Sequence, residues 1–157
     1  GSYQYTSGML QSTRAYQTGF IEARVSFSTD VGVVPAFWLQ NNASGQTNAP
    51  FIDIFRFDST KINKPLFGVN WRSGQELKNY TSEYSQPVGA QQFHTYGLLW
   101  RAGVVQAYFD GVAGPIYSSA NVPTDPSYIT LSLAALKGSS APNSAKMTID
   151  YIRAWTP

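Results

Sequence analysis

The sequence contains no cysteine and only one histidine, His94, among its 157 residues. The absence of cysteine excludes disulfides, zinc–thiolate sites, iron–sulfur clusters and cysteine nucleophiles. A single histidine cannot form a cluster that holds a transition metal, and any Ser-His-Asp triad would depend on that one residue. Carboxylates, hydroxyls and aromatic rings remain as the groups that can carry chemistry.

Charged residues are also scarce, at 13% of the chain, where soluble proteins usually have about 25%. The eleven Lys and Arg residues are scattered singly, so we expect no nucleic-acid partner. No apolar run approaches the roughly 20 residues of a membrane-spanning helix, so we expect no membrane partner. The length fits one monomeric domain over residues 1–157.

Apolar and polar residues alternate repeatedly along the chain, whereas the 3.6-residue period of a helix is almost absent. In residues 19–28, Ile21, Ala23, Val25 and Phe27 fall on one face and polar residues on the other, which is typical of a half-buried antiparallel strand. Many short strands predict an all-β sandwich or barrel. The further predicted strands are 9–14, 35–40, 51–58, 66–71, 94–100, 104–109, 128–136 and 147–155.

Six segments follow one another in an informative order. They read Tyr5-Thr-Ser-Gly-Met-Leu-Gln-Ser, Gly19-Phe-Ile-Glu-Ala-Arg-Val, Pro35-Ala-Phe-Trp-Leu, Phe93-His-Thr-Tyr-Gly-Leu-Leu-Trp, Tyr108-Phe-Asp-Gly and Ile149-Asp-Tyr-Ile-Arg-Ala-Trp. Their order resembles glycoside hydrolase family 16, which contains endo-β-glucanases, laminarinases, agarases and carrageenases. The resemblance implies a concanavalin-like β-jelly roll of two antiparallel sheets, one of them concave and lined with aromatic residues that contact an extended polysaccharide.

The resemblance also bears on the extent of the domain. Members of the family usually have one or more strands before the Tyr-x-Ser-Gly segment. We therefore expect a trimmed or minimal jelly roll that is one module of a larger protein. Because such domains act on extracellular polysaccharides, we also expect the protein to be secreted.

The family's catalytic strand has the pattern Glu-hydrophobic-Asp-hydrophobic-any-Glu, in which a β-bulge brings both glutamates to the concave face. Retaining glycosidases need two such carboxyls about 5–5.5 Å apart. The matching segment here, Phe51-Ile-Asp-Ile-Phe-Arg56, keeps Asp53 but has Phe51 and Arg56 where the glutamates would stand. Phenylalanine has no lone pair, and arginine does not release a proton near neutral pH. We therefore predict no catalytic residues at these positions.

The same strand has groups that suit sugar binding. If the bulge is present, the side chains at 51, 53, 56 and 58 face the cleft, and those at 52, 54 and 57 enter the core. An aromatic ring can stack on a pyranose, aspartate can accept from hydroxyls, and arginine can donate in a fork. We predict a non-catalytic polysaccharide-binding module whose ligand-binding residues are Trp38, Phe51, Asp53, Arg56, Asp58, Asn70, Trp71 and Arg72.

Two alternatives stay open. If the catalytic pattern is shifted by two residues, Asp53 and Asp58 become the carboxylate pair of an endo-glycosidase, although aspartate is one methylene shorter than glutamate and the middle position becomes Phe55. The other alternative is a structural or oligomerising sandwich domain.

The basic residues and the spacing of the acidic residues bear on the ligand and the cofactor. Arg56, Arg72 and Lys78 favour an anionic over a neutral glycan, because guanidinium groups match carboxylate and sulfate geometry. A calcium ion is known in members of the family, but no acidic loop here has a ligand spacing that demands one, so we expect no cofactor and keep a structural calcium ion as the alternative. The resemblance assigns the last tryptophan, Trp155, to strand packing.

Overall fold

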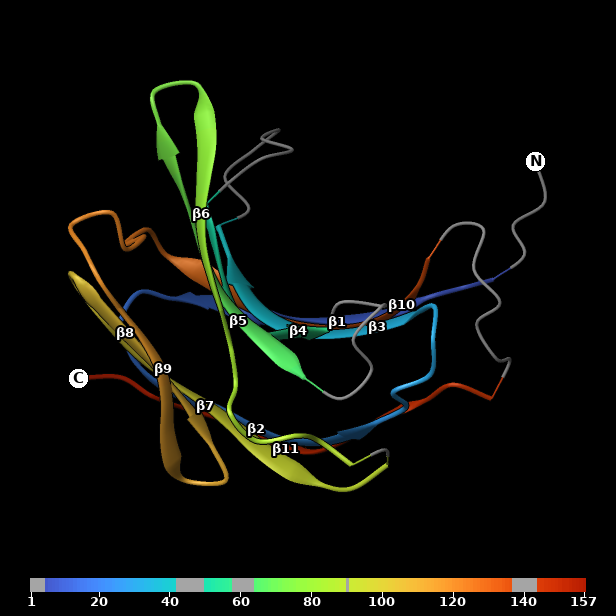
Figure 1. Ribbon diagram of the computed structural model, residues 1–157. Helices are drawn as coiled ribbons and strands as arrows, with labels where there is room; N and C mark the ends of the chain where they lie inside the picture. Colours follow the sequence, from blue (N-terminus) through green and yellow to red (C-terminus); the bar gives the residue numbers. More distant parts are fainter. Residues whose placement is uncertain (1–4, 42–49, 58–63, 90, 137–143) are drawn as a thin grey trace.

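Two antiparallel β-sheets pack face to face in the computed structural model, which describes residues 5–41, 50–57, 64–89, 91–136 and 144–157 (Figure 1). Sheet A contains, in spatial order, β1 (Gly8–Tyr16), β10 (Ser127–Ala135), β3 (Val33–Gln40), β4 (Phe51–Phe57), β5 (Pro65–Ser73) and β6 (Glu76–Glu83). Sheet B contains β11 (Met147–Trp155), β2 (Gly19–Phe27), β7 (His94–Arg101), β8 (Val104–Phe109) and β9 (Val112–Ser118). The predicted all-β jelly-roll sandwich is confirmed. No helix of the described residues is long and apolar enough to cross a membrane.

Two of these strands, β6 and β9, are missing from the sequence prediction. Both are edge strands, one in each sheet. Most residues of β6 are exposed, and β9 contains Gly114 and Pro115. Edge strands avoid long apolar rows, and they tolerate proline because one side of the strand has no partner. The alternation that identifies the central strands is therefore weak at the edges, and the described residues contain eleven strands rather than eight or nine.

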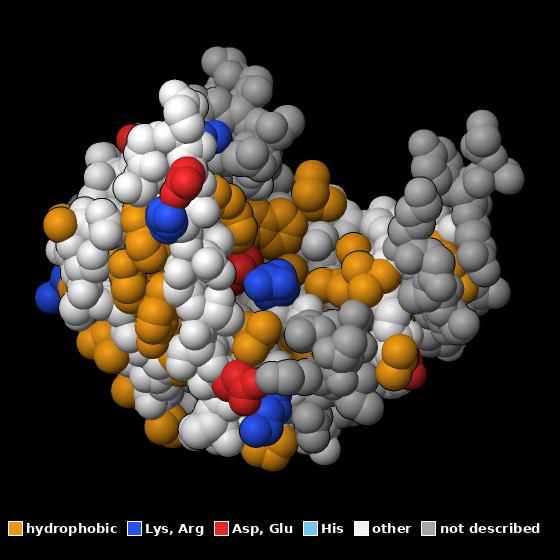
Figure 2. All heavy atoms as spheres, turned by 45° about the horizontal axis from the view of Figure 1, so that its top comes forward, with side chains coloured by type: hydrophobic (Ala, Val, Ile, Leu, Met, Phe, Trp, Pro, Cys, Tyr) orange, Lys and Arg blue, Asp and Glu red, His pale blue; other side chains and the backbone are white. Residues whose placement is uncertain are grey.

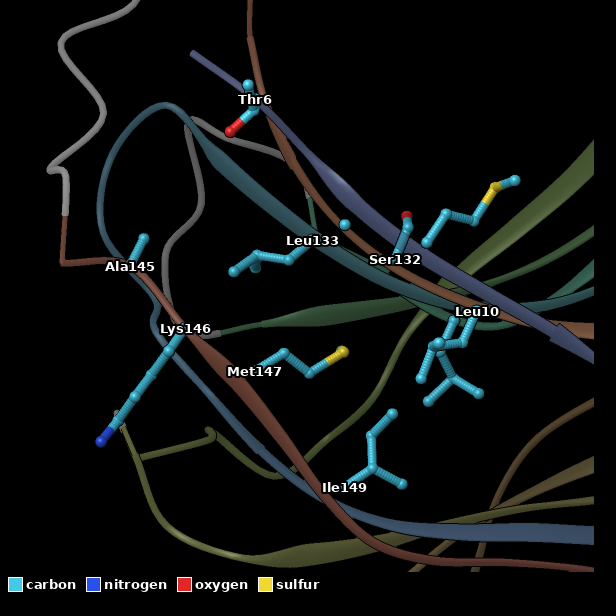
Figure 3. A pocket seen from close by; sticks show the side chains of 11 residues that line it. Thr6, Leu10, Ser132, Leu133, Ala145, Lys146, Met147 and Ile149 are labelled. Atoms are coloured by element: carbon cyan, nitrogen blue, oxygen red, sulfur yellow. The ribbon is translucent and has the colours of Figure 1, made fainter.

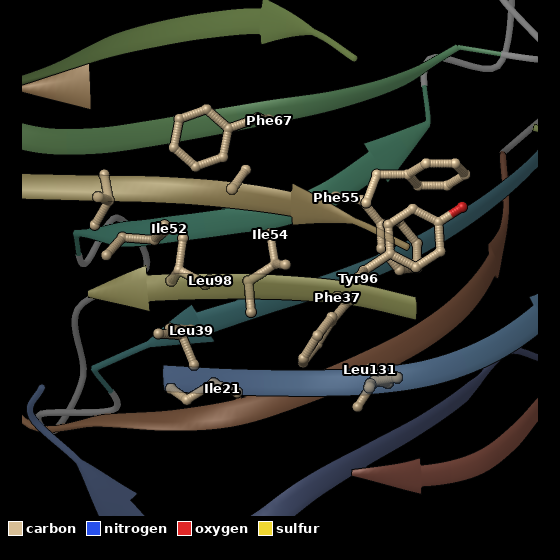
Figure 4. Close-up of a cluster of buried hydrophobic side chains, with 14 of the residues drawn as sticks. Ile21, Phe37, Leu39, Ile52, Ile54, Phe55, Phe67, Tyr96, Leu98 and Leu131 are labelled. Carbon is tan, nitrogen blue, oxygen red and sulfur yellow. The ribbon is translucent and has the colours of Figure 1, made fainter. Parts of the chain in front are cut away.

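The inner faces of the two sheets form one hydrophobic core (Figure 4). The inward-facing residues of β2 are those predicted from alternation, and each is at most 2% exposed. Aromatic rings fill much of the space, and the Phe55 and Tyr96 centroids lie 4.3 Å apart. The buried hydroxyl of Tyr84 donates to the carbonyl of Ile54 at 2.6 Å. This satisfied hydrogen bond removes most of the cost of burying a polar group.

Strand β4 contains the expected β-bulge. Between Asp53 and Arg56, two residues of β4 oppose a single residue of β5, and the pairing with β3 shifts at the same place. The two bulge residues, Ile54 and Phe55, are both fully buried. The extra residue returns Arg56 to the face that carries Phe51 and Asp53, as the sequence predicts.

Candidate functional site

The outer face of sheet A is curved (Figure 1) and carries a hollow of about 250 Å³, which we call the concave hollow. A space-filling view onto this face shows acidic and basic side chains next to each other among hydrophobic ones (Figure 2). Strands β3, β4 and β10 supply the lining. The lining residues are Ala36, Trp38, Gln40, Phe51, Asp53, Arg56 and Ser132.

Asp53 and Arg56 form an ion pair at the floor of the concave hollow. Asp53 is 4% exposed, and its Oδ2 accepts from Arg56 Nε at 3.3 Å. Burial raises the pKa of Asp53 from 3.8 to about 6, and the charge and hydrogen bond of Arg56 oppose this rise. The Arg56 side chain remains 45% exposed. At neutral pH the pair therefore presents an ionised acceptor and a guanidinium whose terminal nitrogens face solvent.

The backbone of β5 makes room for this carboxylate. Gly68 lies directly opposite Asp53 in the β4–β5 pairing. A Cβ at Gly68 would lie 3.0 Å from Asp53 Oδ2, which is closer than ordinary van der Waals contact. The missing side chain is thus a condition for the position of Asp53.

Two aromatic side chains complete the hollow. Trp38 pairs with Asp53 across β3 and β4, and its indole Nε1 donates to Gln40 Oε1 at 3.1 Å. Phe51 is half-buried at the start of β4. On β5 its neighbour is Asn70, which is 9% exposed and belongs to the same face. Rings and amides therefore lie beside the charged pair.

The structure brings together most of the predicted binding residues. Trp38, Phe51, Asp53 and Arg56 line the concave hollow. Arg72 lies two residues beyond Asn70 on β5, and its Nη1 donates to the Gln75 carbonyl at 3.3 Å. Asp58 lies outside the described residues, and the proposed Asp53–Asp58 catalytic pair therefore does as well.

Trp71 does not lie at the cleft. It shares the inner face of β5 with residues of the core, and its ring stacks on Tyr117 of sheet B with a centroid distance of 5.6 Å. Tyr117 in turn stacks on Tyr80 at 4.8 Å. The prediction for Trp71 is wrong because even spacing from the buried Phe67 and Val69 turns the tryptophan inward.

Lys78 also faces away from the concave hollow. It lies opposite Trp71 in the β5–β6 pairing, not opposite Asn70 or Arg72, and its ammonium forms an exposed ion pair with Glu76. The expectation that Lys78 contributes positive charge to the cleft is therefore wrong.

A second hollow, of about 420 Å³, opens between the edge strands β1 and β11. Leu133, Met147 and Ile149 extend into the space between the two sheets (Figure 3). The lining contains no aromatic ring and no carboxyl group, so it lacks the groups that make the concave hollow chemically distinctive. In the described part of the chain, no three His, Asp or Glu side chains gather where they could hold a metal ion.

Comparison with known proteins identifies a family. The family model described as Glycosyl hydrolases family 16 matches residues 2–153. The endo-1,3-1,4-beta-glycanase ExsH of Rhizobium meliloti (strain 1021) is 34% identical over 165 residues, which cover 98% of this chain and 34% of that protein. The chain spans between 34% and 40% of the length of the first four curated relatives that it matches.

Solved structures show the same fold. A structure described as a native glycosidic hydrolase has a TM-score of 0.80 and 24% identity, and the match covers 99% of this chain and 72% of that one. A Bacteroides ovatus mixed-linkage glucan GH16 protein, in complex with a G4G4G3G product, has a TM-score of 0.77 and 19% identity. That match covers 94% of this chain and 74% of the other.

Proposed function

The chain belongs to glycosyl hydrolases family 16, and from this premise we propose that it is a non-catalytic member that binds an extended polysaccharide in the concave hollow. One observation carries the proposal. The bulge in β4 places Phe51, Asp53 and Arg56 on one face, and the resemblance puts the two catalytic glutamates at the first and third of these positions. At the two positions where the family has carboxylates, this strand has the ring of Phe51 and the guanidinium of Arg56.

The chemistry of the lining supports binding rather than hydrolysis. Asp53 is the one carboxyl group among the described residues that line the hollow, and double displacement needs two. Asp53 is also buried and paired with Arg56, which restricts its approach to an anomeric carbon. Phe51 and Trp38 offer rings that stack on the apolar faces of pyranoses. Asp53 accepts hydrogen bonds from hydroxyls.

The charge of the site supports an anionic polysaccharide as ligand. Arg56 keeps 45% of its side chain exposed, and its fork of donors matches a carboxylate or sulfate. Arg72 adds a second cation on the same face of β5 as Asn70. The proposal requires no metal or cofactor. We place the domain outside the cell, as a monomeric module of a longer protein.

Affinity electrophoresis of the full chain tests this proposal. Gels containing κ-carrageenan, alginate, laminarin or mixed-linkage β-glucan serve as the panel. We expect retardation, strongest with an anionic polymer and weaker at high salt, because exposed charges act over only about 8 Å at physiological ionic strength. Phe51→Ala and Arg56→Ala should each weaken retention by about tenfold.

Lys78→Ala is the matched control, because it removes an exposed cation that faces away from the hollow. It should migrate like the wild type in every gel. Migration of the wild type that no polysaccharide alters would contradict the proposal. Binding that is insensitive to salt would restrict the ligand to neutral glycans.

A further inference from the structure

A row of apolar side chains crosses one end of the opposite face of the molecule, the outer face of sheet B. Trp155 of β11 pairs with Phe20 of β2, and Phe20 pairs with Leu99 of β7. We call these three residues the outer strip. They line a groove of about 540 Å³, which falls within the roughly 300–1,000 Å³ of typical small-molecule sites. Trp155 is 50% exposed, although the family resemblance assigns it to strand packing.

The aromatic rings of the outer strip are held in place by their surroundings. The Phe20 centroid lies 5.7 Å from that of Trp155 and 5.5 Å from that of Tyr108, whose ring meets it edge to face. Gly97 lies beneath Phe20, and a Cβ there would come within 2.8 Å of Phe20 Cζ. A ring fixed in this way loses little conformational entropy when a ligand stacks on it.

Polar groups flank the rings. Thr18 and Thr156 are among the lining residues, and Arg101 adds an exposed cation. The indole Nε1 of Trp155 donates to no residue of the described part of the chain, whereas Trp38 and Trp100 donate theirs to Gln40 and Pro123. No Asp or Glu side chain is among the described residues that line the groove. Rings with donors at their rim match a pyranose, which has apolar faces and an equatorial edge of hydroxyls.

The rest of the face argues against a protein partner. Tyr151 donates to Glu22 at 2.8 Å and lies under the Arg153 guanidinium. Arg24 pairs with Asp150 at 2.6 Å. These polar groups are satisfied within the chain and confine the apolar surface to one end of the sheet. A stable protein interface needs about 800 Å² on each partner, with an apolar centre, whereas here three apolar side chains lie beside these satisfied polar groups.

We propose that the outer strip is a second saccharide-binding site, with Trp155 and Phe20 as the stacking surface. This inference goes beyond the proposed function, because it concerns the opposite face of the sandwich and rests on different residues. Two sites that face away from each other would let one chain hold two polysaccharide strands, or bind a polymer network with a gain in avidity.

The four tryptophans give a direct test by NMR of the ¹⁵N-labelled full chain. Each indole N–H signal is assigned by a Trp→Phe variant, and the probes are laminaritetraose, a mixed-linkage glucan tetrasaccharide and a κ-carrageenan tetrasaccharide. We expect the Trp155 signal to shift saturably with at least one probe. Trp100 is fully buried and bonded to the Pro123 carbonyl, so its signal should stay fixed.

Arg56→Ala separates the two sites. In this variant the Trp155 shift should persist while the Trp38 shift weakens. A Trp38 shift without a Trp155 shift, for all three probes, would overturn the outer site and leave the proposed function standing. A Trp155 shift without a Trp38 shift would overturn the proposed function and leave the outer site standing. The absence of both shifts would overturn both proposals.

Trp155→Ala provides a second readout in polysaccharide gels. It should lower retention by about tenfold, whereas Ile116→Ala should not change it. Ile116 is a fair control because it is 51% exposed on the same sheet and lies outside the groove. If the Trp155 signal instead moves with protein concentration and not with sugar, the strip is a self-association surface and the proposal is wrong.

Discussion

On each outer face of the sandwich, a glycine leaves space for a side chain of the neighbouring strand, but the two side chains differ in chemistry. On sheet A the absent side chain of Gly68 leaves space for the carboxylate of Asp53, and on sheet B that of Gly97 leaves space for the ring of Phe20. The carboxylate is buried and needs Arg56 beside it. The ring rests on a face where Arg24 pairs with Asp150, and where Tyr151 contacts both Glu22 and Arg153. A register shift orients a residue of each site, Arg56 on β4 and Trp155 on β11, so the two sites differ in the burial and charge of the groups that they hold.

This difference has an energetic consequence. The concave hollow depends on the bulge in β4, whose residues Ile54 and Phe55 belong to the core. The outer strip also depends on a register shift, between Ile149 and Tyr151 of β11, but its three side chains do not belong to the core. Changes behind the hollow should therefore lower stability strongly, while changes in the strip should lower it little and act mainly on ligand binding.

The largest effect should come from truncating the core side of the bulge. Phe55→Ala removes a fully buried ring and should lower the free energy of unfolding by about 3–5 kcal/mol. Leu99→Ala, in the outer strip, should lower it by about 1 kcal/mol or less. Urea unfolding of both variants measures this difference. Equal losses would show that the two faces depend on the core in the same way.

The second effect concerns the pH dependence of stability. Because the pKa of Asp53 is raised from 3.8 to about 6 in the folded chain, the folded state binds a proton more tightly than the unfolded state. The resulting stability is fully present below pH 3.8 and is lost as the pH rises through 6. Between pH 3.8 and pH 6, the free energy of unfolding of the wild type should fall by on the order of 2 kcal/mol relative to that of Asp53→Asn.

Urea unfolding of the wild type and Asp53→Asn at a series of pH values measures that loss. Asp150→Asn is the control, because Asp150 is half-exposed on the other sheet and pairs with Arg24. A wild-type-minus-Asp53→Asn difference that does not change with pH would contradict the buried, desolvated state of Asp53.

The two glycines should respond differently to the same change. In Gly68→Ala the new methyl group meets Asp53 Oδ2 at 3.0 Å, next to a carboxylate that Arg56 also holds. We expect a loss of about 1–2 kcal/mol in the free energy of unfolding. In Gly97→Ala the nearest atom is the far end of the Phe20 ring, at 2.8 Å, and the new methyl group should displace this ring from its contacts with Tyr108 and Trp155. Thermal unfolding of Gly97→Ala should show a smaller loss of stability than that of Gly68→Ala. The NMR signal of the Trp155 indole N–H should shift in Gly97→Ala.

The smallest effect is expected for the exposed ion pair of the outer face. Arg24 and Asp150 are 39% and 48% exposed, and exposed pairs are typically worth 0.2–1 kcal/mol. A double-mutant cycle with Arg24→Ala and Asp150→Ala should give a coupling energy in this range. The same cycle on Arg56 and Asp53 should give a larger value, and the reverse order would contradict the comparison between the faces.

Sequence alternation was sufficient to predict the central strands, because burial on one face imposes a period of two, whereas the cleft-facing side of β4 was predicted from the β-bulge that the family resemblance implies. It could also have placed Trp71, which follows Phe67 and Val69 at even spacing. Edge strands β6 and β9 were missed because such strands lack an apolar row.

Other features depend on pairing between strands. The contacts of Gly68 with Asp53 and of Gly97 with Phe20 follow from strand register, which no local pattern contains. The exposure of Trp155 also depends on register, because the shift between Ile149 and Tyr151 reverses the alternation of β11 and turns Trp155 to the outer face. The chemistry of the hollow was therefore more predictable than the second groove.

The most direct test of the central claim is a reducing-end assay on the wild-type chain with the four polysaccharides of the binding panel. The account predicts retention in the gels without release of reducing ends, because Phe51 and Arg56 stand where two carboxylates are needed. Release that disappears in both Asp53→Asn and Asp58→Asn would contradict it and establish a glycosidase that uses the shifted pair.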